Sequence, residues 1–349
     1  MAEHVLVVRL DNAGDVLLAG PAVRAVASTA ARVAFLAGPN GREAAELLPG
    51  VDDTLVFRAP WIDPDPEPVD LAAIAALVDE LAARRIDEAV ILTSFHQNAL
   101  PLALLLRLAG IPAIAAWSDD YPGSLLDVRH RAEGELHEVE RGLSLVATLG
   151  YVLPATDDGR LAVRRPALGR NAAAGPPYVV VHPGASDPAR AWSAEQNAAL
   201  VEVLVQRGRR VVVTGSPSER ELTALVAAAG GDGVLDLGGR TDLGELAEVL
   251  AGADAVVVGN TGPAHLAAAV GTPVVSLYAP TVPAARWRPW GVATALLGDQ
   301  EIVCAGCRAR VCPVPGHPCV ASVSVEEVAA ALDELAPRAH PRPLLEAAR

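Results

Sequence analysis

The segment 256–272, VVVGNTGPAHLAAAVGT, contains the residue types best suited to binding an anion. An apolar run ends at Asn260, Thr261 and Gly262, and a helical pattern opens at Pro263, where the first helical position needs no amide hydrogen. A turn that delivers a strand onto a helix N-terminus leaves backbone N–H groups unpaired and positive. Phosphate is the natural ligand of such groups, although an ordinary strand-to-helix turn has the same sequence pattern.

A carboxylate that could accept a proton follows the first apolar run of the chain. Asp15 stands where a helix is expected to begin, and its simplest interpretation is a helix N-cap. Alternatively, the carboxylate faces a ligand, is kept ionised by the helix N-terminus and accepts a proton from a hydroxyl. The loop before it holds one glycine, Gly14, where the dinucleotide fingerprint needs three, which argues against a nicotinamide or flavin enzyme.

Two later apolar runs are followed by charged residues that suit a nucleotide. Arg190 comes after the run from Tyr178 to His182, and its planar guanidinium matches diphosphate oxygens. Taken alone, a surface arginine near a helix start is the simpler interpretation. Glu219 comes after the run from Arg210 to Thr214, and its carboxylate either holds a ribose or opens a helix as a favourable dipole partner.

Short apolar runs alternate with helical patterns along most of the chain, which predicts parallel sheets covered by helices. Between two such series lies RRPALGRNAAAGPP, residues 164–177, whose Pro, Gly and Ala content marks a linker. We therefore expect an α/β fold with two Rossmann-like domains facing across a cleft, where ligands bind beyond the strand ends. The expected strands are Val5 to Arg9, Arg32 to Leu36, Glu88 to Leu92, Tyr178 to His182, Arg210 to Thr214, Ala255 to Gly259 and Pro273 to Leu277, and the first expected helix is Asp15 to Ala27.

The composition indicates a globular, acidic protein. The 349 residues are 51% hydrophobic and 20% charged, and the net charge of −14 opposes nucleic-acid binding, because a phosphate backbone needs a basic face. Arg9 follows a single short apolar run, so we expect no signal peptide. The apolar stretch from Ala99 to Trp117 is interrupted by Pro, Arg and Gly, which predicts a buried helix and a strand with no transmembrane segment. We expect a cytoplasmic protein, with peripheral attachment at the inner face of a membrane as the alternative.

Four segments together resemble the heptosyltransferases of lipopolysaccharide core assembly, glycosyltransferase family nine. They are VLVVRLDNAGDVLLAGPAVRAV from Val5, VVVHPGASDPARAW from Val179, VVVTGSPSERE from Val211, and DLGELAEVLAGADAVVVGNTGPAHLAAAVGTPVVSLY from Asp242. The resemblance implies a GT-B type fold, with an acceptor domain at residues 1–165, a donor domain at 178–335 and a C-terminal tail at 336–349. About residues 50 to 160 match only loosely, so the acceptor's identity does not carry over.

The resemblance also implies an activity: inverting transfer of a sugar, as in heptose from ADP-heptose, to a lipopolysaccharide-core-like or other glycan acceptor. Asp15 matches the family's proposed general base. Asn260 stands where the best-known members have aspartate, which puts a direct contact with the donor sugar in doubt. The residues that match donor-binding positions are Arg190 at a lysine position on the diphosphate, Glu219 on the ribose, Thr261 and Gly262 at the phosphate, and Asn260 and His265 beside them.

Cysteines 304, 307, 312 and 319 form a C-x2-C-x4-C-x6-C cluster in a loop at 304–319, which suggests a structural zinc site, with His317 as a substitute ligand. The family members that add the second heptose have a similar cluster. Reduced thiols, a disulfide or a metal cluster fit the spacing as well. We expect this loop to lie beyond the phosphate-binding helix and to offer the reaction no group.

We expect no metal cofactor in catalysis, because protein groups can neutralise the leaving diphosphate. The D-x-D at 63–65 is interpreted as a solvated loop. Two other functions fit the same architecture: a nucleotide-sugar epimerase, and a catalytically silent nucleotide-sugar binding protein. Asp15 and Arg190 favour the transferase.

Overall fold

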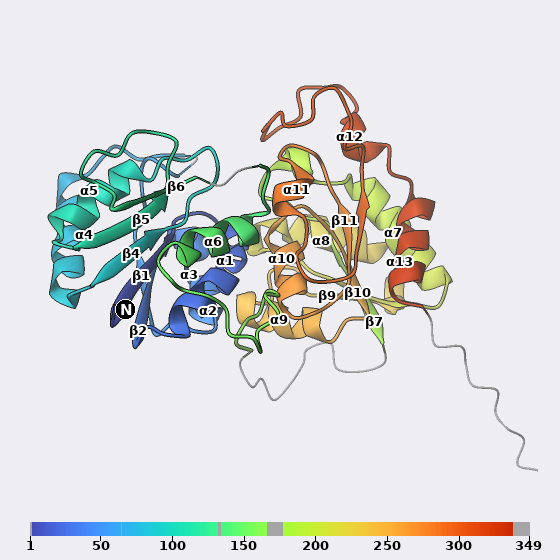
Figure 1. The fold of residues 1–349 in the computed structure, drawn as a ribbon. Coiled ribbons are helices and arrows are strands. Elements are labelled where there is room, and N and C mark those ends of the chain that lie inside the picture. Colours follow the sequence, from blue (N-terminus) through green and yellow to red (C-terminus); the bar gives the residue numbers. More distant parts are fainter. Residues whose placement is uncertain (1, 64, 132–133, 166–176, 338–349) are drawn as a thin grey trace, which may run out of the picture.

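The computed structural model describes residues 2–63, 65–131, 134–165 and 177–337, and it contains two six-stranded parallel sheets (Figure 1). The first sheet has the order β3-β2-β1-β4-β5-β6, which places the reversal of strand order, and so the expected ligand side, at the carboxyl end of β1. Its strands are β1 (His4–Arg9), β2 (Arg32–Ala37), β3 (Asp53–Val56), β4 (Glu88–Ile91), β5 (Ala113–Trp117) and β6 (Val128–His130).

Helices cover both faces of this sheet, which explains why its strands are continuous apolar runs. Val5 and Val7 of β1 belong to the core under α1, α2 and α6, whereas Leu6 and Val8 belong to the core under α4 and α5. The helices are α1 (Ala13–Leu18), α2 (Gly20–Ala27), α3 (Arg42–Leu47), α4 (Leu71–Arg84), α5 (Leu100–Leu108) and α6 (Glu138–Ala147), with a 3-10 turn η1 (Pro39–Gly41).

The second sheet repeats the topology of the first, with the order β12-β11-β10-β7-β8-β9. Its strands are β7 (Tyr178–His182), β8 (Arg210–Val213), β9 (Val234–Asp236), β10 (Ala255–Gly259), β11 (Val274–Leu277) and β12 (Thr294–Leu297). Its helices are α7 (Ala194–Gln206), α8 (Arg220–Ala228), α9 (Leu243–Ala251), α10 (Gly262–Ala269), α11 (Ala284–Trp287), α12 (Pro318–Ala321) and α13 (Val325–Leu335), with 3-10 turns η2 (Pro188–Arg190), η3 (Pro217–Glu219) and η4 (Gly231–Gly233).

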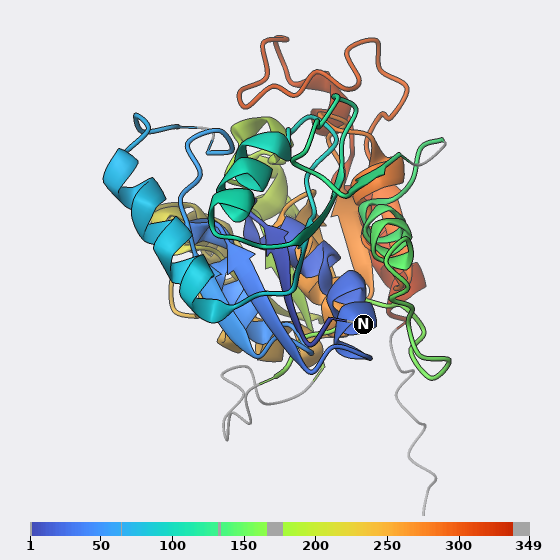
Figure 2. The same ribbon diagram turned by 60° about the vertical axis from the view of Figure 1, so that its left-hand side comes forward.

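The two domains meet through pairs of helices. Helix α1 packs on α10, and α3 packs on α9. A Cβ on Gly14 would lie 3.0 Å from His265 Cδ2 and 3.2 Å from Gly262 Cα, so a larger residue would force these neighbours to shift by tenths of an ångström. The chain between β12 and α12 extends from one end of the second domain (Figures 1 and 2).

The predicted α/β fold with two Rossmann-like domains is confirmed, and the seven expected strands occur within a residue of their predicted ends. The expected helix from Asp15 to Ala27 was wrong in extent, because the chain forms α1 and α2 with a break at Ala19. The stretch 99–117 forms α5 and β5 as expected. Most of the predicted linker, residues 166–176, and most of the tail, residues 338–349, lie outside the described residues.

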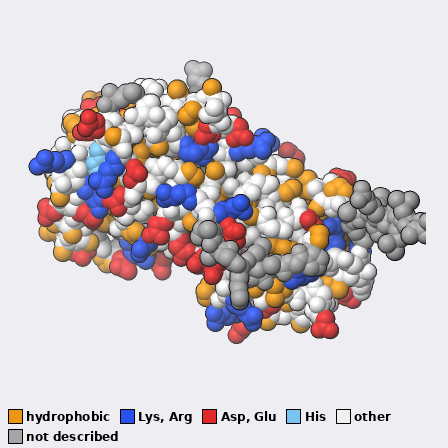
Figure 3. Space-filling model, turned by 90° about the horizontal axis from the view of Figure 1, so that it is seen from below, with side chains coloured by type: hydrophobic (Ala, Val, Ile, Leu, Met, Phe, Trp, Pro, Cys, Tyr) orange, Lys and Arg blue, Asp and Glu red, His pale blue; other side chains and the backbone are white. Residues whose placement is uncertain are grey.

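The surface carries both signs of charge. On the face shown in Figure 3, acidic and basic side chains are interspersed with hydrophobic ones. Within the part of the chain that the structure describes, no helix is long and apolar enough to cross a membrane.

Candidate active site between the two domains

A buried arginine organises the carboxylates at the end of β1. Arg9, the last residue of this strand, is 4% exposed, and its guanidinium contacts three carboxylates. Its Nε lies 2.6 Å from Asp11 Oδ2, its Nη2 lies 2.9 Å from Asp15 Oδ1, and its Nη1 lies 2.9 Å from Glu138 Oε2. Such partners are necessary because an unpaired buried charge is costly.

The surplus of carboxylates changes the protonation of this cluster. Burial raises the pKa of Asp11 to about 6, Arg9 opposes this rise, and Asp15 adds to it. Burial alone would lower the pKa of Arg9, but the carboxylates around it outweigh burial and raise that pKa. The guanidinium of Arg9 therefore stays charged. Asp11 also accepts hydrogen bonds from Ser94 Oγ and Gln97 Nε2.

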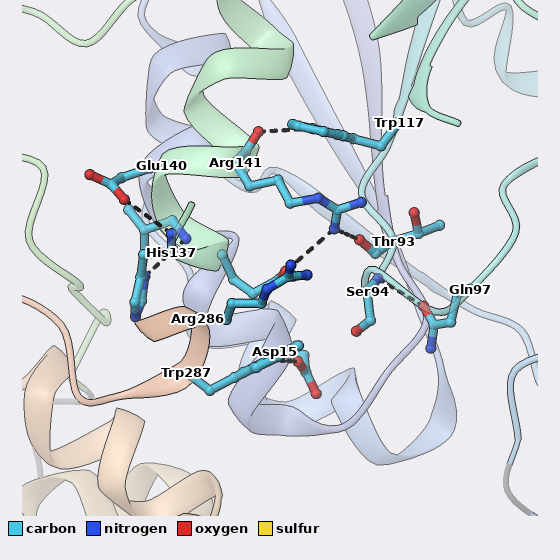
Figure 4. A network of polar contacts seen from close by, with 12 residues as sticks. Asp15, Thr93, Ser94, Gln97, Trp117, His137, Glu140, Arg141, Arg286 and Trp287 are labelled. Atoms are coloured by element: carbon cyan, nitrogen blue, oxygen red, sulfur yellow. Dashed lines mark hydrogen bonds and ion pairs between the residues drawn. The ribbon is translucent and has the colours of Figure 1, made fainter. Parts of the chain in front are cut away.

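Asp15 is held by donors from both domains. The N-cap of α1 is Asn12, and Asp15 is the third residue of the helix, so the interpretation of Asp15 as an N-cap was wrong. Its Oδ1 accepts from Arg9 Nη2 at 2.9 Å. The same oxygen accepts from Trp287 Nε1 of the second domain at 3.2 Å (Figure 4). The side chain is 24% exposed. Within the described residues no hydrogen bond reaches Oδ2, which leaves this oxygen available to a ligand.

Aromatic and cationic side chains gather beside Asp15. The rings of Phe95 and Trp287 lie 5.4 Å apart, and the guanidiniums of Arg286 and Arg308 lie 4.5 Å and 5.5 Å from the Phe95 ring centroid. Arg286 also pairs with Glu135 at 3.1 Å. Sequence reasoning missed these residues, because their roles depend on contacts between the two domains.

Arg190 lies in η2, on the loop that follows β7. Its Nη2 is 3.3 Å from Asp187 Oδ2, and the side chain is 29% exposed. Its Nε is buried and has no hydrogen-bond partner within the described residues. A guanidinium with an unsatisfied donor near the interface suits an anionic ligand, so diphosphate binding by Arg190 stays a prediction with structural support.

Glu219 caps the turn η3. Its Oε2 accepts from the Ser216 amide at 2.7 Å in a capping box, so the helix-opening role considered for this residue is present. The carboxylate also covers Gly184, where an added Cβ would lie 2.1 Å from Glu219 Oε1. The side chain therefore lies at the ends of β7 and β8, as ribose binding requires, and that role stays a prediction.

The turn before α10 offers fewer free amides than its sequence suggests. The Thr261 amide donates to the Gly259 carbonyl at 2.9 Å, and the Ala264 amide donates to the Thr261 carbonyl at 3.0 Å. Pro263, the second residue of α10 and not the first as expected, has no amide hydrogen. Anion binding by the Gly262 amide therefore stays a prediction, and the buried Thr261 Oγ1, which has no partner within the described residues, is a second candidate.

Asn260 and His265 flank this turn. The Asn260 Nδ2 donates to the Ala279 carbonyl at 3.1 Å, and its Oδ1 accepts from the Ala279 amide at 3.2 Å. An aspartate could not donate to that carbonyl, so the amide side chain fits this loop. Burial lowers the pKa of His265 to about 4, and the imidazole is therefore neutral near pH 7. Direct contacts of Asn260 and His265 with a donor stay predictions.

The Cys-rich loop lies closer to the site than we expected. The Ala189 amide donates to the Arg310 carbonyl at 2.9 Å, and His317 Nε2 lies 3.0 Å from the Ala189 carbonyl. The loop therefore supports the residue next to Arg190, and Arg308 packs on Phe95. These contacts bring the loop close to Arg190 and Phe95, and the expectation that it offers the reaction no group stays a prediction.

The four cysteines differ in how far they are exposed to solvent. Cys307 is exposed, Cys304 and Cys312 are half-buried, and Cys319 is buried. Across the described ranges, no group of three or more His, Cys, Asp or Glu side chains could hold a metal ion. The D-x-D aspartate Asp63 pairs with Arg58, and Pro64 lies outside the described residues. Structural zinc stays a prediction.

Comparisons with known proteins agree on one family. The model of glycosyltransferase family 9 (heptosyltransferase) matches residues 74–317. Lipopolysaccharide heptosyltransferase 3 of Escherichia coli is 34% identical over 166 residues, 44% of this chain and 47% of that protein. Lipopolysaccharide heptosyltransferase 1 of Salmonella typhimurium is 33% identical over 186 residues, 52% of this chain and 58% of that protein. The matches thus span about half the length of these curated relatives.

Solved structures share the fold at low sequence identity. The E. coli ADP-heptose lps heptosyltransferase II superposes with a TM-score of 0.72 at 21% identity, over 95% of this chain and 98% of that chain. An E. coli heptosyltransferase solved with ADP-2-deoxy-2-fluoro heptose gives a TM-score of 0.72 at 22% identity, over 95% and 99% of the two chains. With a family model that covers well over half of its residues, this chain belongs to glycosyltransferase family 9.

Proposed function

We propose that this protein is an inverting glycosyltransferase that moves a heptose from ADP-heptose to a hydroxyl of a lipopolysaccharide-core-like or other glycan acceptor. Membership of family 9 supports the transferase class. A structural neighbour solved with an ADP-heptose analogue supports the choice of donor. In this proposal the acceptor binds to residues 1–165 and the donor binds to residues 178–335.

The observation that carries the proposal is the position of Asp15 beside the turn at the start of α10. Gly14, next to Asp15, packs directly on Gly262, and Arg9 fixes Asp15 Oδ1 while Oδ2 remains open. A carboxylate of one domain thus lies beside the anion-binding turn of the other. A base and a leaving-group site in this arrangement are what a displacement at a glycosyl diphosphate needs.

The reaction is a single displacement. Asp15 Oδ2 takes the proton of the acceptor hydroxyl while the hydroxyl oxygen attacks the anomeric carbon on the face opposite the diphosphate. The new C–O bond forms as the bond from that carbon to the diphosphate oxygen breaks, so the carbon is inverted and ADP leaves with the bonding electrons. Arg190, the Gly262 amide and the N-terminal dipole of α10 stabilise the negative charge on ADP.

The remaining donor contacts follow from the same arrangement. Glu219 accepts hydrogen bonds from the ribose, and Thr261, Asn260 and His265 line the donor on either side of Gly262. These groups act by hydrogen bonding, so no metal takes part in the displacement in this proposal.

Product analysis after incubation with ADP-heptose, with and without a heptose-free lipopolysaccharide core, tests the function. We expect ADP release that depends on the acceptor, together with an acceptor that gains one heptose. Conversion of the donor to an epimer without an acceptor would overturn the proposal in favour of an epimerase. Donor binding without any turnover would indicate a silent binding protein instead.

A further inference from the structure

The indole of Trp287 reaches the carboxylate of Asp15 from the opposite domain. Trp287 ends α11 in the second domain, and its Nε1 donates to Asp15 Oδ1 at 3.2 Å across 272 residues of sequence. Arg9 of the first domain donates to the same oxygen at 2.9 Å. Figure 4 shows the Trp287 ring pointing at the carboxylate. Each domain thus provides one donor to Asp15 Oδ1.

This arrangement determines which oxygen of Asp15 can act on a substrate. With both donors on Oδ1, the carboxylate cannot rotate about its Cβ–Cγ bond without losing a charge-assisted hydrogen bond. Oδ2 is therefore directed away from both donors. Trp287 belongs to the second domain, so its hydrogen bond to Oδ1 exists only while α11 lies against the first domain.

Neighbouring residues hold α11 and the chain after it against the first domain without touching Asp15. Arg286 pairs with Glu135, at 3.1 Å. His137 Nε2 donates to the Arg288 carbonyl at 2.9 Å. The Trp290 ring stacks on His137 with centroids 4.5 Å apart, and Trp290 Nε1 donates to the Gly159 carbonyl at 3.0 Å. Among these residues of α11 and the chain after it, Trp287 contacts the proposed base, Asp15.

We propose that Trp287 is a positioning residue that aligns Asp15 for proton transfer when the two domains are in contact. The inference rests on the proposed role of Asp15 as the general base. It makes proton transfer depend on domain closure, since the full set of donors to Oδ1 exists only in the closed arrangement.

Trp287→Phe tests this inference, because it removes the N–H and keeps an aromatic ring against Phe95. We expect kcat to fall about tenfold, the scale of one hydrogen bond to a charged group, while KM for ADP-heptose changes by less than about twofold. Trp290→Phe is the matched control, since it also removes an indole N–H that crosses the interface but leaves Asp15 untouched. Its kcat should stay within about twofold of the parent.

A double-mutant cycle with Asp15→Asn separates positioning from a general structural effect. If Trp287 acts through Asp15, Trp287→Phe should cause less than about a twofold further loss in the Asp15→Asn background. An equal loss in both backgrounds would overturn the positioning role while leaving the proposed function intact. Near-normal turnover of Asp15→Asn alone would overturn the base role of Asp15 and with it the positioning role of Trp287. Thermal unfolding of each variant establishes that it is folded.

Discussion

Arg9 is shared by three carboxylates, and this sharing fixes where Asp15 lies. The guanidinium is 4% exposed and spans from the end of β1 to Glu138 at the start of α6. Asp11 and Glu138 are themselves nearly buried, with side chains 9% and 1% exposed. The cluster therefore contributes to stability and to the orientation of the proposed base at once.

Removing the guanidinium takes the cation from Asp11 and Asp15, whereas Glu138 keeps Arg141 at 3.4 Å. We expect Arg9→Met to lower the free energy of unfolding by about 3–5 kcal/mol, the typical cost of breaking a buried charge network. Arg42→Met is the control, because Arg42 pairs with Glu46 at the surface, where both side chains are about half exposed or more. That variant should change stability by less than about 1 kcal/mol, as denaturant unfolding will measure. Equal effects of the two substitutions would contradict the account of this cluster.

His265 makes stability depend on pH. Burial lowers its pKa to about 4, so the folded state takes up the proton less readily than the unfolded chain. The contribution of the neutral ring is complete above the unfolded value near pH 6.5 and is lost as the pH falls through about 4. Relative to His265→Gln, the parent should lose on the order of 3 kcal/mol of unfolding free energy between about pH 7 and 4.

The comparison with His265→Gln is needed because Asp11 acts in the opposite direction. Its pKa is raised to about 6, so protonation of Asp11 favours the folded state over the same range. Asp11 is present in both proteins, and its contribution cancels in their difference. Parallel stability curves for parent and variant would mean that His265 is not buried as described.

Two helix N-termini, of α1 and α10, meet at Gly14 and Gly262, and this contact sets the distance between the proposed base and the phosphate-binding turn. A methyl group on Gly14 would lie 3.0 Å from His265 Cδ2 and 3.2 Å from Gly262 Cα, closer than carbon atoms normally pack. A larger side chain at this contact would therefore move α1 relative to α10.

Gly14→Ala should separate α1 from α10 and reduce transfer. We expect kcat/KM to fall at least about tenfold, because a displacement of tenths of an ångström misaligns the base and the leaving group. Gly142→Ala is the control: it lies in α6, where the added Cβ would be 3.4 Å from Ala22 Cβ, an ordinary contact. Since alanine favours helix, that variant should be neutral or gain up to about 1 kcal/mol of stability with unchanged turnover. Normal kinetics of Gly14→Ala would contradict the close contact.

The exposure of the four cysteines in the Cys-rich loop predicts how rapidly each thiol reacts. Cys319 is buried and its pKa is raised by that burial, whereas Cys304, Cys307 and Cys312 are at least partly exposed. In native protein purified without a histidine tag, three thiols should react rapidly with a thiol reagent and Cys319 only on unfolding. About one zinc per chain, lost in Cys304→Ser/Cys307→Ser, together with no rapidly reacting thiol, would establish the metal site that the spacing suggests.

For the molecule as a whole, sequence reasoning predicted the two sheets because strands buried on both faces are continuous apolar runs, as in Tyr178–His182. It also placed Asp15, Arg190, Glu219 and Gly262 after strand ends, and the structure brings Gly262 against Gly14, the residue before Asp15. It missed the partners that orient Asp15, because Glu138 is 129 residues from Arg9 and Trp287 is 272 residues from Asp15. Neither pairing has a local signal, and both follow only from how the two domains pack.

The proposed role of Asp15 as base depends on its hydrogen bond from Arg9, on the contact between α1 and α10, and on Trp287 across the domain interface. We expect Asp15→Asn to lower kcat at least about 10²-fold, while the Kd of ADP-heptose measured by calorimetry stays within about twofold. Asp127→Asn, which removes the carboxylate charge from a pair with Arg107 within the first domain, should keep full turnover. Near-normal turnover by a folded Asp15→Asn protein would contradict the account and reduce Asp15 to a structural partner of Arg9 and Trp287.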